Sequence, residues 1–292
     1  MKTRAFHSSK TLTAVLLTLC LLIFLCGCDD GSSSSGADSS SETGEVVIGL
    51  TDAAGDFVSY VVAVTSVSLT KQNGGTVETL PLTTTVDFAE YTDMTEFLTI
   101  ATVPAGAYTE AALTLDYSNA EIFVKNESGE AVEAAAILDE NGEPVSMLTV
   151  SLNLETANKL IITPGAPAHL TLDFDLAASN EVVFDAEGNA EVTVLPMLTA
   201  DIEPTAPKIH RLRGPLKSVT PEEDTFTVVI RPFRHSFKPD KERFGAMQVF
   251  VNSDTVYDIN GSVYEGDAGI AALAGLEKNA GVVILGDLLF SP

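Results

Sequence analysis

Apolar and polar residues alternate with a period of two along much of the chain after residue 44. The alternation is clearest in residues 113–117, 150–154 and 170–176, where leucine, valine or phenylalanine is followed by threonine, serine, asparagine or aspartate. A strand with one face buried and the other in water produces this pattern, which is typical of antiparallel sheets. We therefore expect several half-buried strands rather than helices.

Turn residues separate these strand-like segments. Asparagine, glycine and serine recur at residues 73–75, 127–129, 141–142 and 187–189, which favours tight hairpin connections. No long stretch has the apolar spacing of an amphipathic helix; residues 87–98 fit either a short helix or a loop. The pattern predicts an all-β fold, an antiparallel β-sandwich of immunoglobulin-like or transthyretin-like type.

The last third of the chain has a pattern of its own. Strands are expected at residues 225–230, 247–252 and 281–286, and Asp267 is in place to cap a short helix that ends near residue 276. The chain then stops on apolar residues before Pro292. We interpret this part as a small β-barrel-like domain that is either incomplete or cut short.

The first 28 residues have the composition of an export signal. Three basic residues precede an apolar run at residues 11–25, which is shorter than the ~20 residues of a membrane-spanning helix. Residues 25–28, Leu-Cys-Gly-Cys, resemble the lipobox of bacterial lipoproteins, which implies that Cys28 is acylated and becomes the new N-terminus. The alternative is a plain cleaved signal or an uncleaved anchor helix.

Cysteine usage agrees with a lipid anchor. The three cysteines lie at positions 20, 26 and 28, so cleavage after residue 27 leaves one, and acylation consumes it. Residues 28–43 then form a tether of serine, glycine and acidic residues, a composition that stays disordered. We expect a protein of the bacterial cell envelope, anchored to a membrane and facing the periplasm.

Charge divides the mature chain in two. After cleavage, 13 basic and 41 acidic residues give a formal charge of −28. Residues 44–203 carry a net charge of −23, whereas residues 204–292 are close to neutral at −1. The change falls at a proline-bearing stretch, so we predict a domain boundary there. A strongly acidic exported chain is unsuited to nucleic acid, and the expected partners are the membrane, an envelope protein or a polymer.

Three motifs carry a resemblance to a known family. Residues 51–57, Thr-Asp-Ala-Ala-Gly-Asp-Phe, residues 103–109, Val-Pro-Ala-Gly-Ala-Tyr-Thr, and residues 172–175, Leu-Asp-Phe-Asp, resemble motifs of bacterial envelope proteins assigned to domain of unknown function 4382. The resemblance covers residues 44–202 and implies a β-sandwich on a lipoprotein, without an activity. Ala54 replaces the usual proline. Residues after 204 resemble, more loosely, the domain of unknown function 5666 family.

Two acidic pairs are candidates for a calcium site. Asp52 and Asp56 flank a glycine turn, and Asp173 and Asp175 point the same way if they belong to one strand. Calcium needs 6–8 oxygen ligands, and the sequence has no EF-hand loop to supply them. The alternative is structural: the first pair forms a turn and the second lies on the solvated face of a strand. No other cofactor is expected.

One stretch combines basic and aromatic residues. It contains Arg231, Arg234 and Lys238, which could bind lipid phosphates or an anionic polymer. The alternative is a solvated hairpin loop whose phenylalanines pack on their own sheet.

Signatures of enzymes are missing from the sequence. It contains no G-x-S-x-G, no H-E-x-x-H and no phosphate-binding glycine loop, and tryptophan is absent. We therefore expect a non-enzymatic binding or structural module. The alternatives are a calcium-dependent adhesion module and an envelope hydrolase whose site follows no known motif.

Overall fold

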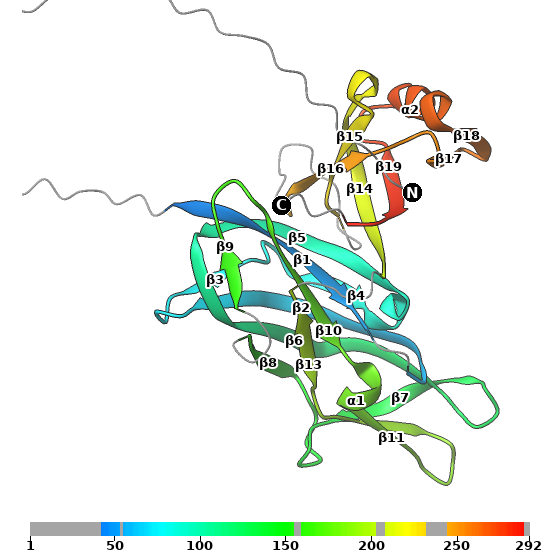
Figure 1. Ribbon diagram of the computed structural model, residues 1–292. Coiled ribbons are helices and arrows are strands. Elements are labelled where there is room, and N and C mark those ends of the chain that lie inside the picture. The colour runs from blue at the N-terminus through cyan, green and yellow to red at the C-terminus, as the bar shows by residue number, and fades with distance from the viewer. Residues whose placement is uncertain (1–41, 53–54, 155–158, 203–207, 232–243, 289–292) are drawn as a thin grey trace, which may run out of the picture. The chain divides into compact units, whose positions relative to one another are not determined.

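The protein is described by a computed structural model (Figure 1). The ranges that it describes are residues 42–52, 55–154, 159–202, 208–231 and 244–288. Within them most residues belong to β-strands, 62% being strand and 9% helix. The predicted all-β class is therefore confirmed, and the arrangement of sheets is sandwich-like.

One sheet runs in the order β13-β10-β1-β5-β14-β15-β16, with β19 paired to β14. Strand β1 lies between β10 and β5, so both of its edges are paired, and its residues from Val46 to Thr51 are buried. The strands of this sheet are β1 (Thr43–Thr51), β5 (Met94–Pro104), β10 (Ala168–Phe174), β13 (Leu198–Asp201), β14 (Ile209–Thr220), β15 (Thr225–Val229), β16 (Ala246–Phe250) and β19 (Gly281–Gly286).

The second sheet runs in the order β11-β12-β7-β6-β2-β3, with β4 paired to β2 and with β8 and β9 paired to β6. Its long strands β2 and β6 alternate buried and accessible positions, as a sheet with one covered face requires. The strands of this sheet are β2 (Phe57–Lys71), β3 (Thr76–Glu78), β4 (Thr84–Asp87), β6 (Gly106–Lys125), β7 (Ala131–Leu138), β8 (Met147–Asn153), β9 (Leu160–Ile162), β11 (Asn180–Phe184) and β12 (Ala190–Val194).

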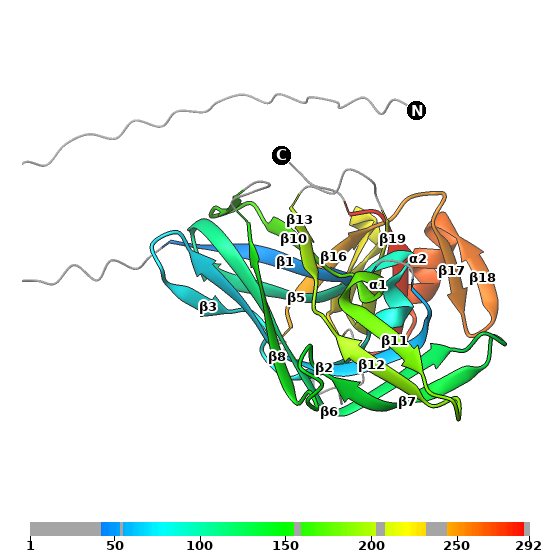
Figure 2. The same ribbon diagram turned by 90° about the horizontal axis from the view of Figure 1, so that it is seen from below.

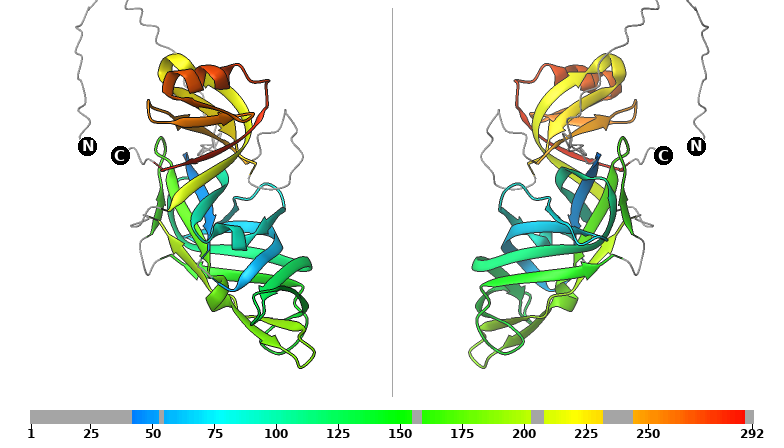
Figure 3. Two further views of the ribbon diagram at one scale, coloured as in Figure 1. Left: turned by 90° about the vertical axis from the view of Figure 1, so that its right-hand side faces the viewer. Right: turned by 90° about the vertical axis from the view of Figure 1, so that its left-hand side faces the viewer.

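The two sheets pack against each other (Figures 1 and 3). A shared apolar core holds them together. Tyr60 of β2 is wholly buried, and its ring lies 5.2 Å from that of Phe57 and 6.2 Å from that of Phe174 on β10 of the other sheet. The Tyr60 hydroxyl shares a hydrogen bond with that of Tyr117 and donates to Asn180. Satisfying this hydroxyl lets a large aromatic side chain occupy the centre of the core.

The remaining elements are short. Strands β17 and β18 form a separate hairpin, and helix α2 lies beside it, as Figure 2 shows. Their bounds, with those of the other helices, are η1 (Phe88–Tyr91), α1 (Leu176–Ser179), η2 (Pro221–Glu223), β17 (Val256–Ile259), β18 (Ser262–Glu265) and α2 (Gly266–Ala274). Helix α2 confirms the short helix expected near Asp267, but Glu265 is its N-cap and Asp267 lies in its first turn.

Pairing directions differ from a purely antiparallel arrangement. Most neighbouring strands are antiparallel, but three pairs among the described strands are parallel, namely β1 with β10, β7 with β12 and β5 with β14. The last of these pairs joins Ile209 to Met94, so the sheet continues from the acidic part of the chain into the neutral part. None of the described sheets closes into a barrel.

Candidate functional site

The two acidic motifs of the sequence meet at the paired ends of β1 and β10. Thr51 lies opposite Asp173 in the parallel register, and Asp52 follows directly, with only 1% of its surface exposed. Lys208, more than 150 positions later in the sequence, also lies here. Its Nζ donates to the Thr51 hydroxyl at 2.9 Å and to the carbonyl of Asp52 at 2.8 Å.

The carboxylates here support the short helix α1. Asp52 Oδ1 accepts from the backbone N of Leu176 at 2.9 Å, and Asp175, the N-cap, accepts from Ala178 N at 2.9 Å. The expectation that Asp173 and Asp175 extend from one strand is wrong, because β10 ends at Phe174 and the chain turns into the helix. Burial raises the pKa of Asp173, and the charge of Lys208 opposes that rise.

No metal-binding cluster accompanies these acids. Across the part of the chain that the structure describes, no group of three or more His, Cys, Asp or Glu side chains could hold a metal ion. The cation at the end of β1 is the ammonium of Lys208. Asp56 lies apart from it, and its carbonyl accepts from Lys125 N at 3.0 Å beside a cavity of about 530 Å³ that includes Gly55 and Phe184.

A buried ionic cluster joins β5 to β14. The Glu96 carboxylate is wholly buried, and it accepts from Arg213 Nε at 2.8 Å and from Arg211 Nε. Arg211 also bonds Glu90 at 3.0 Å, and its guanidinium lies 5.6 Å from the ring centre of Tyr91. Burial raises the pKa of Glu96, and the guanidiniums of Arg213 and Arg211 oppose that rise. The cluster therefore stabilises the pairing of the two strands.

Two buried histidines meet on the opposite face of this sheet. His169 on β10 and His210 on β14 have ring centres 6.0 Å apart, and Phe97 stacks on His210 at 5.3 Å. Burial, together with the charge of the neighbouring His210, lowers the pKa of His169 to about 4. Burial also lowers the pKa of His210, against the opposing charge of Asp287. The sequence analysis did not predict that these two histidines are neighbours, because 41 positions separate them in the chain.

The basic stretch is described only at its beginning. Arg231 donates from Nη1 to the carbonyl of Ile230 at 2.8 Å, and its guanidinium lies 5.4 Å from the ring centre of Phe244. Arg234, Lys238 and the predicted lipidation residue Cys28 lie outside the described residues.

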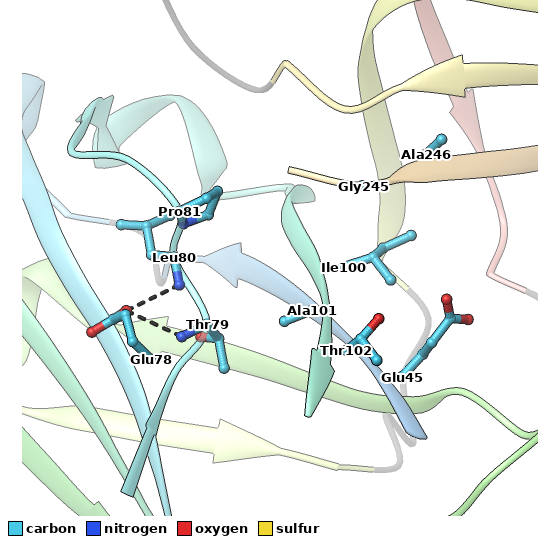
Figure 4. A pocket seen from close by; sticks show the side chains of 10 residues that line it. All are labelled: Glu45, Glu78, Thr79, Leu80, Pro81, Ile100, Ala101, Thr102, Gly245 and Ala246. Carbon is cyan, nitrogen blue, oxygen red and sulfur yellow. Dashed lines mark hydrogen bonds between the residues drawn. The ribbon is translucent and has the colours of Figure 1, made fainter. Parts of the chain in front are cut away.

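A groove runs along the outer edge of β5 (Figure 4). Its volume is about 530 Å³. Figure 4 shows Leu80 and Pro81 on one side, Gly245 and Ala246 on the other, and Ala101 between them. The sequence did not predict this groove, because it is formed by four segments that are far apart in the chain. Like the cavity beside Asp56, it is concave, and it also borders the edge of a strand.

Comparison with known proteins identifies one family. A family model described as Domain of unknown function (DUF4382) matches residues 43–196, more than half of the chain. Neither the curated proteins nor the solved structures contain a significant match. Among the described residues, no helix is long and apolar enough to cross a membrane. The match includes all three motifs that suggested this family, and the chain belongs to the DUF4382 family.

Proposed function

We propose that this protein is a lipid-anchored component of the bacterial cell envelope whose β-sandwich works by binding a partner rather than by catalysis. The groove beside β5 carries the binding part of this proposal. It combines apolar walls with an open strand edge, which suits recognition of another chain. The anchor part rests on the sequence of residues 25–28.

The charged groups of the core have structural partners. Glu96 is bonded by Arg211 and Arg213, and Lys208 is held by Thr51 and Asp52. Such groups serve the fold, because a buried charge needs its partners. Residues 44–203 as a whole carry a net charge of −23, which favours a cationic partner.

Photo-crosslinking tests the binding part of the proposal. A photoreactive amino acid in place of Thr102, an exposed residue of the groove, is expected to yield a discrete adduct in the native envelope. The matched control places the same amino acid at Val183, which is 52% exposed on β11 of the other sheet. The absence of any adduct at Thr102, or identical adducts at both positions, would contradict binding through the groove.

The anchor is tested separately. Mass spectrometry of the mature N-terminus is expected to find an acylated Cys28, and Cys28→Ser should move the protein from the membrane fraction to the soluble fraction. A free thiol at residue 28 would refute lipidation. This result does not depend on the groove, so the two parts of the proposal can fail independently.

A further inference from the structure

The outer edge of β5 has a free section. Strand β1 pairs with one edge of β5 from Glu96 to Pro104, whereas β14 pairs with the other edge only at Met94–Glu96. Farther along this outer edge, Ile100 N donates to the carbonyl of Phe244 at 2.8 Å. No described strand pairs with the outer edge beyond that bond.

Strand geometry fixes which backbone groups face the groove. In an antiparallel pair, successive residues turn their N–H and C=O groups to opposite edges. Ile100 faces outward, so Thr102 faces outward too. Ala105 confirms this alternation, because its N–H donates inward to the carbonyl of Glu42 at 2.7 Å. Thr102 therefore presents one donor and one acceptor to the groove.

The groove beside this edge has two walls. Leu80 and Pro81 form one wall, and Ala246 begins the other (Figure 4). Gly245 allows the second wall to approach closely: its φ is +89°, and a Cβ there would lie 2.8 Å from Cβ of Ile100. The side chains of an added strand would alternate between the two faces of the sheet.

The charge of the groove selects a basic partner. Two carboxylates line it, and that of Glu78 is bonded by the backbone N–H groups of Val67, Thr79 and Leu80 at 2.9–3.1 Å. Glu45 is exposed, and its carboxylate has no hydrogen bond or ion pair with another described residue. None of the residues lining the groove is basic.

We propose that the groove binds an extended basic peptide, which adds to the outer edge of β5 as a strand. Thr102 supplies the backbone hydrogen bonds, and Glu45 meets a lysine or arginine of the peptide. Main-chain bonds give such complexes their affinity, and the side-chain contacts give specificity. The inference rests on the proposed binding function and names the class of partner for its groove.

Three labelled peptides test the proposal by fluorescence anisotropy with the full mature chain in detergent. KTVTVTK is basic and favours the extended strand; ETVTVTE keeps the backbone and reverses the charge; KTPTPTK keeps the charge and removes backbone donors. KTVTVTK is expected to bind saturably, with an affinity at least about tenfold higher than that of ETVTVTE or KTPTPTK. Equal binding of KTVTVTK and KTPTPTK would mean non-specific attraction to an acidic protein and would overturn the proposal.

Variants at one position separate backbone from side chain. Thr102→Pro removes the outward N–H and is expected to weaken binding of KTVTVTK at least about tenfold. The matched Thr102→Val keeps the N–H and should bind like the natural chain. Glu45→Gln should reduce the preference for KTVTVTK over ETVTVTE. Equal affinities of the two Thr102 variants, both folded by circular dichroism, would overturn strand addition.

Hydrogen exchange of the natural chain covers the case in which Thr102→Pro fails to fold. Saturating KTVTVTK is expected to slow exchange in residues 100–104, and unchanged exchange there would also overturn the inference. The two proposals remain distinguishable. A crosslinked adduct at Thr102 without peptide binding leaves the binding function standing and removes the strand-addition inference.

Discussion

Glu96 Oε1 accepts a hydrogen bond from Arg213 Nε at 2.8 Å, and this contact joins strands that lie more than a hundred positions apart in the sequence. The Glu96 side chain has 0% exposure, and that of Arg213 has 28%. The bond therefore fastens the neutral C-terminal part of the chain to the acidic sandwich. Arg211 contributes a second bond to the same carboxylate.

Removing the carboxylate is expected to weaken the fold strongly. Glu96→Ala leaves two guanidiniums without their shared partner, and breaking a buried ion pair in this way costs about 3–5 kcal/mol. Because Arg211 and Arg213 retain some solvent access, we expect the lower end of that range. Urea unfolding followed by circular dichroism measures the loss.

Glu90 provides the matched control for this cluster. Its side chain is 51% exposed, and it bonds the same Arg211 at 3.0 Å. An exposed ion pair contributes about 1 kcal/mol or less, so Glu90→Gln should change stability little. If Glu96→Ala proved as mild as Glu90→Gln, the buried cluster would not hold the two parts of the chain together.

The histidine pair predicts a loss of stability in mild acid. Burial lowers the pKa of His169 to about 4, and the usual value is 6.5, so the unfolded chain binds the proton more strongly. Stability from this residue is therefore complete above pH 6.5 and falls as the pH drops towards 4. The full loss is on the order of 3 kcal/mol.

A variant isolates the histidine from the many carboxylates that titrate in the same range. His169→Gln removes the titrating ring, so its stability should fall less steeply between pH 6.5 and 4 than that of the natural chain. Urea midpoints at several pH values measure both slopes. Parallel slopes would show that His169 does not sense pH.

Local pattern made much of the fold predictable from sequence, whereas long-range partners were not. Alternation identified strands such as β6 and β8, because one face of each is packed and the period of two is visible within a few residues. The family motifs around Asp52 and Asp173 were visible for the same reason. Their meeting with Lys208 was not visible, since a lysine 156 positions from Asp52 leaves no local signal.

The groove was hidden for a related physical reason. The groups proposed to bind the peptide are the backbone N–H and C=O of Thr102 and the carboxylate of Glu45. Almost every residue carries the same backbone groups, so those of Thr102 leave no signal in the sequence. Only the pairing of β5 shows that the edge is free. The turn from β10 into α1 was also missed, because Asp175 continues the alternation in sequence while its side chain caps a helix.

Calcium is expected to leave the thermal midpoint unchanged within about 1 °C, whether calcium or a chelator is added. Lys208 already supplies a cation beside Asp52, and no described cluster offers three ligands. Differential scanning fluorimetry of the mature chain measures the midpoint. A rise with calcium that the chelator reverses and Asp173→Asn abolishes would restore the calcium-dependent module.

Helix α2 gives a prediction in which helix propensity and packing oppose each other. Alanine is favoured over glycine in a helix by about 1 kcal/mol. A Cβ on Gly269, however, would lie 1.9 Å from Cδ2 of Tyr257, a ring that is 8% exposed. Such overpacking costs about 1–3 kcal/mol, so Gly269→Ala should destabilise the protein in urea unfolding. Gly281→Ala is the control, because nothing lies within 4 Å of the added Cβ there. Equal stability of the two variants would show that α2 does not pack on Tyr257.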